Sequence, residues 1–116
     1  MKITDIKFEK LRIKLKKPVV VSFGVIEYGE SIILKIETDE GYCGFGEAAP
    51  LAAVTGEVLD NVLSVLLMFK KELIGKDPLD IETIHTIMDG IIIGNTSAKA
   101  AIDIALYDIK GKIMNA

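Results

Sequence analysis

The sequence predicts an α+β domain in which a three-stranded antiparallel meander is followed by three helices. Two observations support this fold class. Apolar residues alternate with a period of two over the first third of the chain, and they recur at helical spacing over the rest. Strands and helices are therefore segregated along the chain, which is typical of α+β and not of alternating β-α-β folds. The length of 116 residues suits one compact domain.

The first strand changes phase within its length. Its apolar residues fall at even positions before Glu9 and Lys10 and at odd positions after them, in the order Ile6, Phe8, Leu11, Ile13 and Leu15. A slip of one residue in the alternation is typical of a β-bulge, so we expect a bulge or kink at this point. Pro18 has no N–H to donate to a ladder, and we expect the strand to end there.

A loop and a hairpin are expected next. Residues 18–30 are rich in valine and contain two glycines, which predicts a loop. The alternation resumes over residues 31–38, and Asp39-Glu40-Gly41 is a turn signal between two extended runs. Residues 42–47 then form the return strand, which completes the meander.

Three helices are expected in the remaining chain. Apolar residues recur at helical spacing over residues 59–73, and Gly75 is a plausible C-terminal stop. Asp80 is expected to cap a second helix, and Thr96 or Ser97 a third. The apolar stripe of the third helix is rich in alanine, which would allow close packing.

Composition and charge argue against several classes of protein. The formal net charge of −3 disfavours a nucleic-acid-binding module, which usually carries a basic excess. Lys14, Lys16 and Lys17 are interpreted as solvated, although they have the charge to steer an anionic substrate. The single cysteine permits no intrachain disulfide. No signal peptide or bilayer-spanning run is evident, so we expect a cytoplasmic protein whose partners include neither nucleic acid nor membrane.

The run Gly44-Phe45-Gly46-Glu47-Ala48-Ala49 matches one form of the dinucleotide-binding fingerprint. That motif needs a parallel sheet and a helix that opens on the motif. Here Pro50 follows at once, and the expected sheet is antiparallel. We therefore favour a structural interpretation, in which the two glycines let another backbone approach the strand.

No catalytic or metal-binding constellation emerges from the other polar residues. His85 is the only histidine and no nucleophile elbow accompanies it, so we interpret it as a surface or half-buried residue. Cys43 is interpreted as a small hydrophobic residue within a strand. Glu47 closes a strand next to two apolar connections and could face a site, but a structural salt bridge or hydrogen bond is favoured. Four aspartates that qualify as metal ligands by type alone are assigned to turns, caps or different helix faces: Asp77, Asp80, Asp103 and Asp108.

Two connections are unusually apolar. Residues 18–26 and 48–56 are long and contain glycine hinges, whereas connections are normally polar. Apolar loops need a cover, and a lid over a ligand site is one way of obtaining it. A loop packed on the domain's own core is the alternative.

Several short runs occur in a fixed order along the chain. They are Lys17-Pro18, the G-x-G-E-A run at residues 44–48, Thr55-Gly56-Glu57, and the helix signature at residues 94–108. Together they resemble the N-terminal capping domain of the enolase superfamily, in its muconate-lactonizing subgroup, over nearly the whole chain. Residues 54–56 and 95–99 are most similar to dipeptide epimerases.

The resemblance implies a two-domain enzyme. A (β/α)-barrel of roughly 250 residues is expected after residue 116. It would supply three acidic Mg²⁺ ligands and two lysines that remove and return the α-proton of the substrate. None of those residues lies in residues 1–116, which alone are not expected to be catalytic. The full-length protein is expected to be an isomerase of the racemase or epimerase type, with its own barrel as a partner.

The resemblance places substrate specificity in the two apolar connections. It assigns substrate contacts to seven residues, namely Phe23, Gly24, Val25, Ile26, Leu51, Val54 and Thr55. Similar alanyl-glutamate epimerases can carry an arginine where Gly24 stands, and glycine cannot pair with a carboxylate. We therefore expect a preference for dipeptides with an uncharged or hydrophobic second residue.

Other assignments stay open from the sequence. Capping domains of N-acylamino-acid racemase, o-succinylbenzoate synthase and muconate cycloisomerase are hard to separate from this one, and the lysines of the barrel would discriminate between them. A homo-oligomer is also open. A small interaction module is the non-enzyme alternative. The apolar connections and the alanine-rich final helix argue against it, because they need a partner surface.

Overall fold

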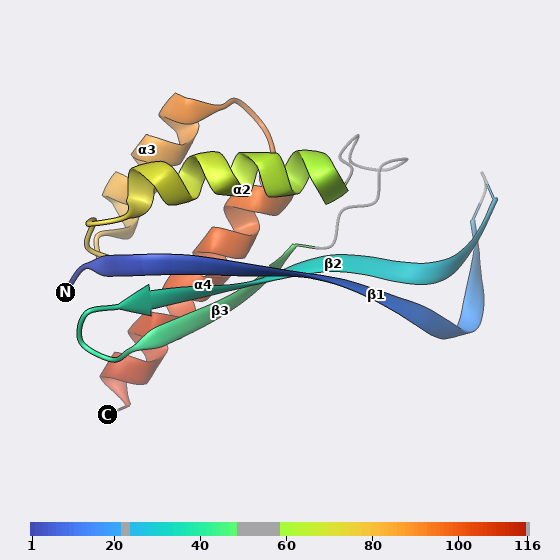
Figure 1. The fold of residues 1–116 in the computed structure, drawn as a ribbon, viewed down its shortest axis with the longest axis horizontal. Helices are drawn as coiled ribbons and strands as arrows, with labels where there is room; N and C mark the ends of the chain where they lie inside the picture. Colours follow the sequence, from blue (N-terminus) through green and yellow to red (C-terminus); the bar gives the residue numbers. More distant parts are fainter. Residues whose placement is uncertain (22–23, 49–58, 116) are drawn as a thin grey trace.

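The expected α+β architecture is confirmed. A computed structural model describes residues 1–21, 24–48 and 59–115, and within residues 12–29 it describes the backbone alone. One antiparallel sheet contains β1 (Ile3–Val21), β2 (Gly24–Thr38) and β3 (Cys43–Ala48) in that order. Three helices follow, α2 (Leu59–Leu73), α3 (Ile81–Ile91) and α4 (Thr96–Met114), as Figure 1 shows.

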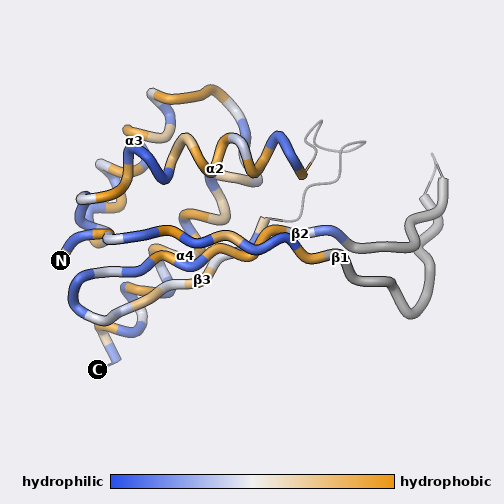
Figure 2. The backbone as a smooth tube through the Cα atoms, viewed as in Figure 1, coloured by the Kyte–Doolittle hydropathy of each residue, from blue (hydrophilic) through white to orange (hydrophobic). Residues whose placement is uncertain are grey.

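The body of the sheet buries one of its two faces beneath the helices. Ile6 pairs with Ile36, and Phe8 with Leu34, across β1 and β2, and Leu34 pairs with Gly46 of β3. Because side chains alternate between the faces of a strand, these residues share one side of the sheet. Ile6, Leu34 and Ile36 are fully buried there. The alternation of hydrophobic and hydrophilic residues along the strands is visible in Figure 2.

The opposite side of the sheet, which we call the open face, carries the odd-numbered residues of the regular ladder, which begins at Asp5. Lys7 pairs with Lys35, and Lys35 with Phe45, so these three form one row across the open face. Lys7 and Phe45 are exposed and Lys35 is half-buried. None of the three belongs to the buried core of the described residues.

The prediction of a bulge near Glu9 and Lys10 is wrong. The ladder between β1 and β2 is regular from Asp5, opposite Glu37, to Lys14, opposite Tyr28, and its irregularities lie outside this stretch. The apolar alternation changes phase for a different reason. The backbone stays in register through Glu9 and Lys10, so the apolar positions of β1 move from one side of the strand to the other.

The prediction of a loop over residues 18–30 is also wrong. The two strands continue as a hairpin, here called the arm (residues 12–21 and 24–29), whose last pair is Val21 with Gly24. Valine and isoleucine favour extended backbone, which accounts for the strand. Pro18 lies between Lys14 and Val19, where the register shifts, so its missing N–H falls outside the regular ladder. The arm projects beyond the helices (Figure 1).

The expected turn, the end of α2 and the start of α3 are confirmed, whereas α3 ends at Ile91, before the expected stop at Gly94-Asn95. Gly41 in the hairpin turn and Gly75 after α2 adopt φ values of +82° and +86°, which favour glycine. The Gly75 N–H donates to the Ile3 carbonyl at 2.8 Å, which ties the end of α2 to β1. Asp80 caps α3, since its Oδ2 accepts from the Thr83 hydroxyl at 2.8 Å and its Oδ1 from the Thr83 N–H at 3.4 Å.

The prediction of a helix cap at Thr96 or Ser97 is wrong. The chain enters α4 through Gly94 and Asn95, which both have positive φ, so Thr96 already lies in the helix. Asn95 occupies the N-cap position without a side-chain capping bond to the helix. Its amide donates instead to the Ile93 carbonyl at 3.0 Å. The backbone conformation, and not a capping hydroxyl, therefore sets the start of α4.

Candidate functional site

The predicted substrate residues divide into two groups. Phe23, Leu51, Val54 and Thr55 lie outside the described residues. Residues 24–26 begin β2 and pair with residues 19–21 at the far end of the arm. Gly24 and Val21 are separated by only two residues, so Gly24 lies at the base of the hairpin connection. The structure thus places these three positions on an extended element and not in a loop.

The two glycines of the G-x-G-E-A run position α4. A Cβ atom built on Gly44 meets the Ala105 carbonyl oxygen at 2.0 Å, and one built on Gly46 meets the Ala101 carbonyl oxygen at 2.0 Å. The main chain of the helix thus lies directly on the main chain of β3. This confirms the structural interpretation of the run. The expected role of the alanines is confirmed with it, since Ala98, Ala101 and Ala105 are buried.

Two side chains of α4 satisfy outward backbone groups of β3. Asp108 Oδ2 accepts from the Phe45 N–H at 2.9 Å, and Lys112 Nζ donates to the Cys43 carbonyl at 2.6 Å. The two side chains also pair with each other at 3.1 Å. The hydrogen bond from Phe45, followed by the Lys112 ammonium, lowers the pKa of Asp108. Asp108 is therefore a structural residue.

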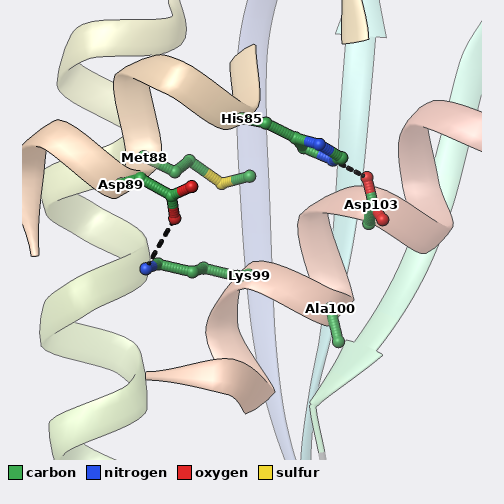
Figure 3. A pocket seen from close by; sticks show the side chains of 6 residues that line it. All are labelled: His85, Met88, Asp89, Lys99, Ala100 and Asp103. Carbon is green, nitrogen blue, oxygen red and sulfur yellow. Dashed lines mark hydrogen bonds and ion pairs between the residues drawn. The ribbon is translucent and has the colours of Figure 1, made fainter. Parts of the chain in front are cut away.

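A pocket of about 230 Å³ lies between α3 and α4. Figure 3 shows two contacts that cross it, a hydrogen bond between His85 and Asp103 and an ion pair between Lys99 and Asp89. Their N–O distances are 2.5 Å and 2.9 Å. Lys99 also donates to the Ile92 carbonyl at 2.8 Å. Hydrogen bonding from Lys99 lowers the pKa of Asp89.

The two contacts across this pocket link α3 to α4. Its lining residues do not form a reaction centre of their own. Its other lining residues are Met88 and Ala100, and the Lys99 amine that also lines it is held by Asp89 and the Ile92 carbonyl. The side chain of His85 is 43% exposed, which confirms its expected half-buried position. Asp103 contacts α3 whereas Asp108 contacts β3, which confirms that the two carboxylates lie on different helix faces.

The pairing of His85 with Asp103 was missed by the sequence analysis. The two residues are 18 positions apart on separate helices. Local periodicity reports which side of a helix a residue occupies, but it does not report which residue of a neighbouring helix it meets. The salt bridge or hydrogen bond expected for the Glu47 carboxylate is not formed with any described residue. Glu47 is exposed at the edge of the sheet.

The described residues contain neither a metal site nor a membrane-spanning helix. Over residues 1–21, 24–48 and 59–115, no three His, Cys, Asp or Glu side chains are grouped so that they could hold a metal ion. The helices of the same residues include none with the length and apolar character needed to cross a bilayer. Cys43, half-buried in β3, forms no disulfide, in line with its expected role as a small hydrophobic residue.

The sequence matches a known family over most of its length. The profile of the mandelate racemase / muconate lactonizing enzyme N-terminal domain matches residues 3–116. The chain is 43% identical to the hydrophobic dipeptide epimerase of Enterococcus faecalis, covering 97% of this chain and 32% of that protein. It is 46% identical to the N-succinyl-L-Arg/Lys racemase of Bacillus cereus, covering 99% of this chain and 31% of that protein.

Solved structures give the same result. A dipeptide epimerase from Enterococcus faecalis, crystallised with Mg and the dipeptide L-Leu-L-Tyr, superposes with a TM-score of 0.94 at 42% identity. The match covers 98% of this chain and 32% of that one. The chain thus spans about a third of the length of the relatives that it matches.

Proposed function

Because this chain belongs to the mandelate racemase / muconate lactonizing enzyme N-terminal domain family, the capping domains of the enolase superfamily, we propose that it caps the substrate site of a longer dipeptide epimerase. In this proposal a (β/α)-barrel follows residue 116 and carries the reaction. The enzyme is cytoplasmic, and it inverts a stereocentre by removing and returning an α-proton. The capping domain contributes binding and the exclusion of water.

The arm is the observation that carries this proposal. It is an extended hairpin that ends in Gly24, Val25 and Ile26 on β2 and in three valines on β1. Apolar residues at the end of a projecting element suit a lid, because closure over a bound substrate removes water from it. The same positions are those that the family resemblance assigns to substrate contact.

Gly24 supports the proposed specificity for the second residue of the dipeptide. A glycine offers no charge to a carboxylate side chain, so binding at this position rests on apolar contact. We therefore propose that the enzyme favours an uncharged or hydrophobic second residue. The Enterococcus faecalis relative carries the name of a hydrophobic dipeptide epimerase, which agrees with this reading.

The identity of 46% to an N-succinyl-L-Arg/Lys racemase favours a second candidate. That relative is named for acylated amino acids, whereas the first is named for dipeptides, and the two identities are similar. Racemisation of an N-acylamino acid by the same α-proton chemistry is therefore the alternative function. The two candidates differ in the group attached to the nitrogen of the reacting residue.

Mg²⁺ is proposed as the cofactor of the longer protein and not as a ligand of this domain. The described residues of the chain do not fit a metal, since they contain no suitable group of three ligands. The Enterococcus faecalis structure was obtained with Mg and a dipeptide, and the chain matches only about a third of it. We assign the ion to the barrel on this basis.

A substrate library in D₂O tests the proposal. The full-length protein is incubated with Mg²⁺ and pools of L-Ala-L-X dipeptides or N-succinyl amino acids, and deuterium at the α-carbon is read by mass spectrometry. We expect exchange in dipeptides with X = Leu, Val, Phe or Tyr. Strong preference for L-Ala-L-Glu would contradict the specificity, and exchange only in N-succinyl substrates would favour the alternative function.

A further inference from the structure

The sheet narrows from three strands to two at a single row of residues. β3 ends at Ala48, which pairs with Ile32 of β2, and Ile32 pairs in turn with Lys10 of β1. Beyond this row β1 and β2 continue without β3 and become the arm (Figure 1). Two-stranded ribbons twist more strongly than wider sheets and have little stability of their own. The direction of the arm is therefore set at the row of Lys10.

An ion pair attaches this row to the helix layer. The Lys10 ammonium lies 2.7 Å from the Asp60 carboxylate, and Asp60 belongs to the first turn of α2. Lys10 reaches this helix because it shares a side of β1 with Ile6 and Phe8, which is the side that faces the helices. The pair thus connects the root of the arm to the start of α2.

A second ion pair joins the same two elements at their other ends. Lys70, in the last turn of α2, lies 3.0 Å from Asp5 near the start of β1. At this end the Gly75 N–H donates to the Ile3 carbonyl and the Ile3 N–H donates to the Lys76 carbonyl, each at 2.8 Å. The backbone itself fixes the two elements there, so the pair of Lys70 and Asp5 has little left to determine. It is the natural comparison for the pair at the root of the arm.

The pair at the root is too exposed to matter much for overall stability. The side chains of Lys10 and Asp60 are 48% and 83% exposed, and ion pairs between hydrated side chains contribute little to the free energy of unfolding. Ile32 and Ala48 of the same row are already buried beneath the helices. A contribution of the pair must therefore be sought in the geometry of the arm.

The length of the arm amplifies a small change at its root. Lys16 lies six residues beyond Lys10 on β1, which corresponds to about 20 Å of extended chain. A change of about 10° in the direction of the arm, which is well inside the range over which strand twist varies, moves that point by about 3.5 Å. A weak contact at the root can therefore decide where the far end of the arm lies.

We propose that the ion pair between Lys10 and Asp60 sets the direction of the arm, which makes both of them positioning residues for the substrate contacts at its far end. This inference rests on the proposed function, in which residues 24–26 contact the dipeptide. A displacement of about 1 Å far from the chemistry can cost on the order of a hundredfold in rate. The position of the arm is therefore a quantity that affects turnover.

Pulsed electron spin resonance on the full-length protein measures the direction of the arm without any substrate. All native cysteines are replaced by alanine, and spin labels are attached at Lys16→Cys on the arm and at Lys110→Cys, an exposed position of α4. The helix α4 is a fixed reference, because its main chain rests on β3. Lys10→Met removes the charge and keeps an aliphatic side chain, whereas Lys10→Arg keeps the charge. Lys70→Met breaks the other ion pair and is the matched control.

We expect Lys10→Met to shift or broaden the distance distribution by about 3.5 Å, whereas Lys10→Arg and Lys70→Met keep the distribution of the parent protein. An unchanged distribution in Lys10→Met would overturn the proposal. An equal change in Lys70→Met would overturn it too, because any loosening of α2 would then be sufficient.

Exchange of the α-proton of L-Ala-L-Leu, measured on the unlabelled proteins, separates this inference from the proposed function. We expect Lys10→Met to raise KM about tenfold while kcat changes by less than about twofold, because the reacting groups are assigned to the barrel and only the arm is displaced. An unchanged KM in a variant whose arm has moved would overturn the positioning role. No exchange in the parent protein, together with a shifted distance in Lys10→Met, would refute the proposed substrate alone.

Discussion

Replacing Gly46 with alanine tests the close approach of α4 to β3. The added Cβ would lie 2.0 Å from the Ala101 carbonyl oxygen and 3.0 Å from its carbon. Separations below 3.0 Å are essentially never seen for real Cβ atoms, so the helix and the strand must separate by at least 1 Å at this point. Neither contact atom belongs to a flexible side chain, so the backbone itself must move.

The expected cost follows from two opposing contributions. Overpacking a well-packed core costs about 1–3 kcal/mol, and a clash with main chain belongs at the upper end of that range. Alanine in place of glycine within a strand returns about 0.5–1 kcal/mol, because it lowers the entropy of the unfolded chain. We therefore expect Gly46→Ala to lower the free energy of unfolding by about 2 kcal/mol.

Urea denaturation followed by circular dichroism measures this change. With a slope of about 2 kcal/mol per molar, the midpoint should fall by about 1 M. Gly111→Ala is the matched control on the same helix, since a Cβ there meets nothing within 4 Å. It should raise stability by about 0.5–1 kcal/mol. If Gly46→Ala were as stable as Gly111→Ala, the close approach would be refuted.

Three further predictions concern charged and specificity positions. The pKa of Asp108 is lowered in the folded state, so its carboxylate stabilises the fold above the ordinary pKa of about 4, and this stabilisation is lost as the pH falls through the lowered pKa. Asp108→Asn should reduce the loss of unfolding free energy between neutral and acidic pH by at most about 1 kcal/mol, because the side chain is partly exposed. The same dependence of unfolding free energy on pH in the variant and the parent protein would contradict this. Asp103→Asn should speed amide exchange in α3 by weakening the contact with His85, whereas the exposed Glu82→Gln should not. Gly24→Arg should raise kcat/KM for L-Ala-L-Glu relative to L-Ala-L-Leu by about tenfold, the value of one charged hydrogen bond, and a fall in that ratio would argue against contact at this position.

Much of the fold could be predicted because its local signals are strong. The helical spacing over residues 59–73, the stop at Gly75 and the cap at Asp80 are each decided within a few residues of chain. The role of Gly44 and Gly46 was predictable for the same reason, since two glycines in a strand have few structural explanations.

The errors have a common physical origin. The phase change at Glu9 depends on what covers each side of the sheet, and the extended course of residues 18–21 and 24–30 depends on pairing between β1 and β2, and both are tertiary properties. Two of the candidate-site contacts, His85 with Asp103 and Phe45 with Asp108, join different elements at separations of 18 and 63 residues. All seven predicted substrate residues stay predictions, and four of them, Phe23, Leu51, Val54 and Thr55, lie outside the described residues.

The contact between the main chains of α4 and β3 has a consequence for how this domain can evolve. A helix that rests on side chains shifts whenever those side chains change in size. At Gly44 and Gly46 the spacing is set by backbone atoms, which every substitution elsewhere leaves in place. The frame can therefore stay constant while the arm changes its sequence, so that the two parts of the domain can diverge at different rates.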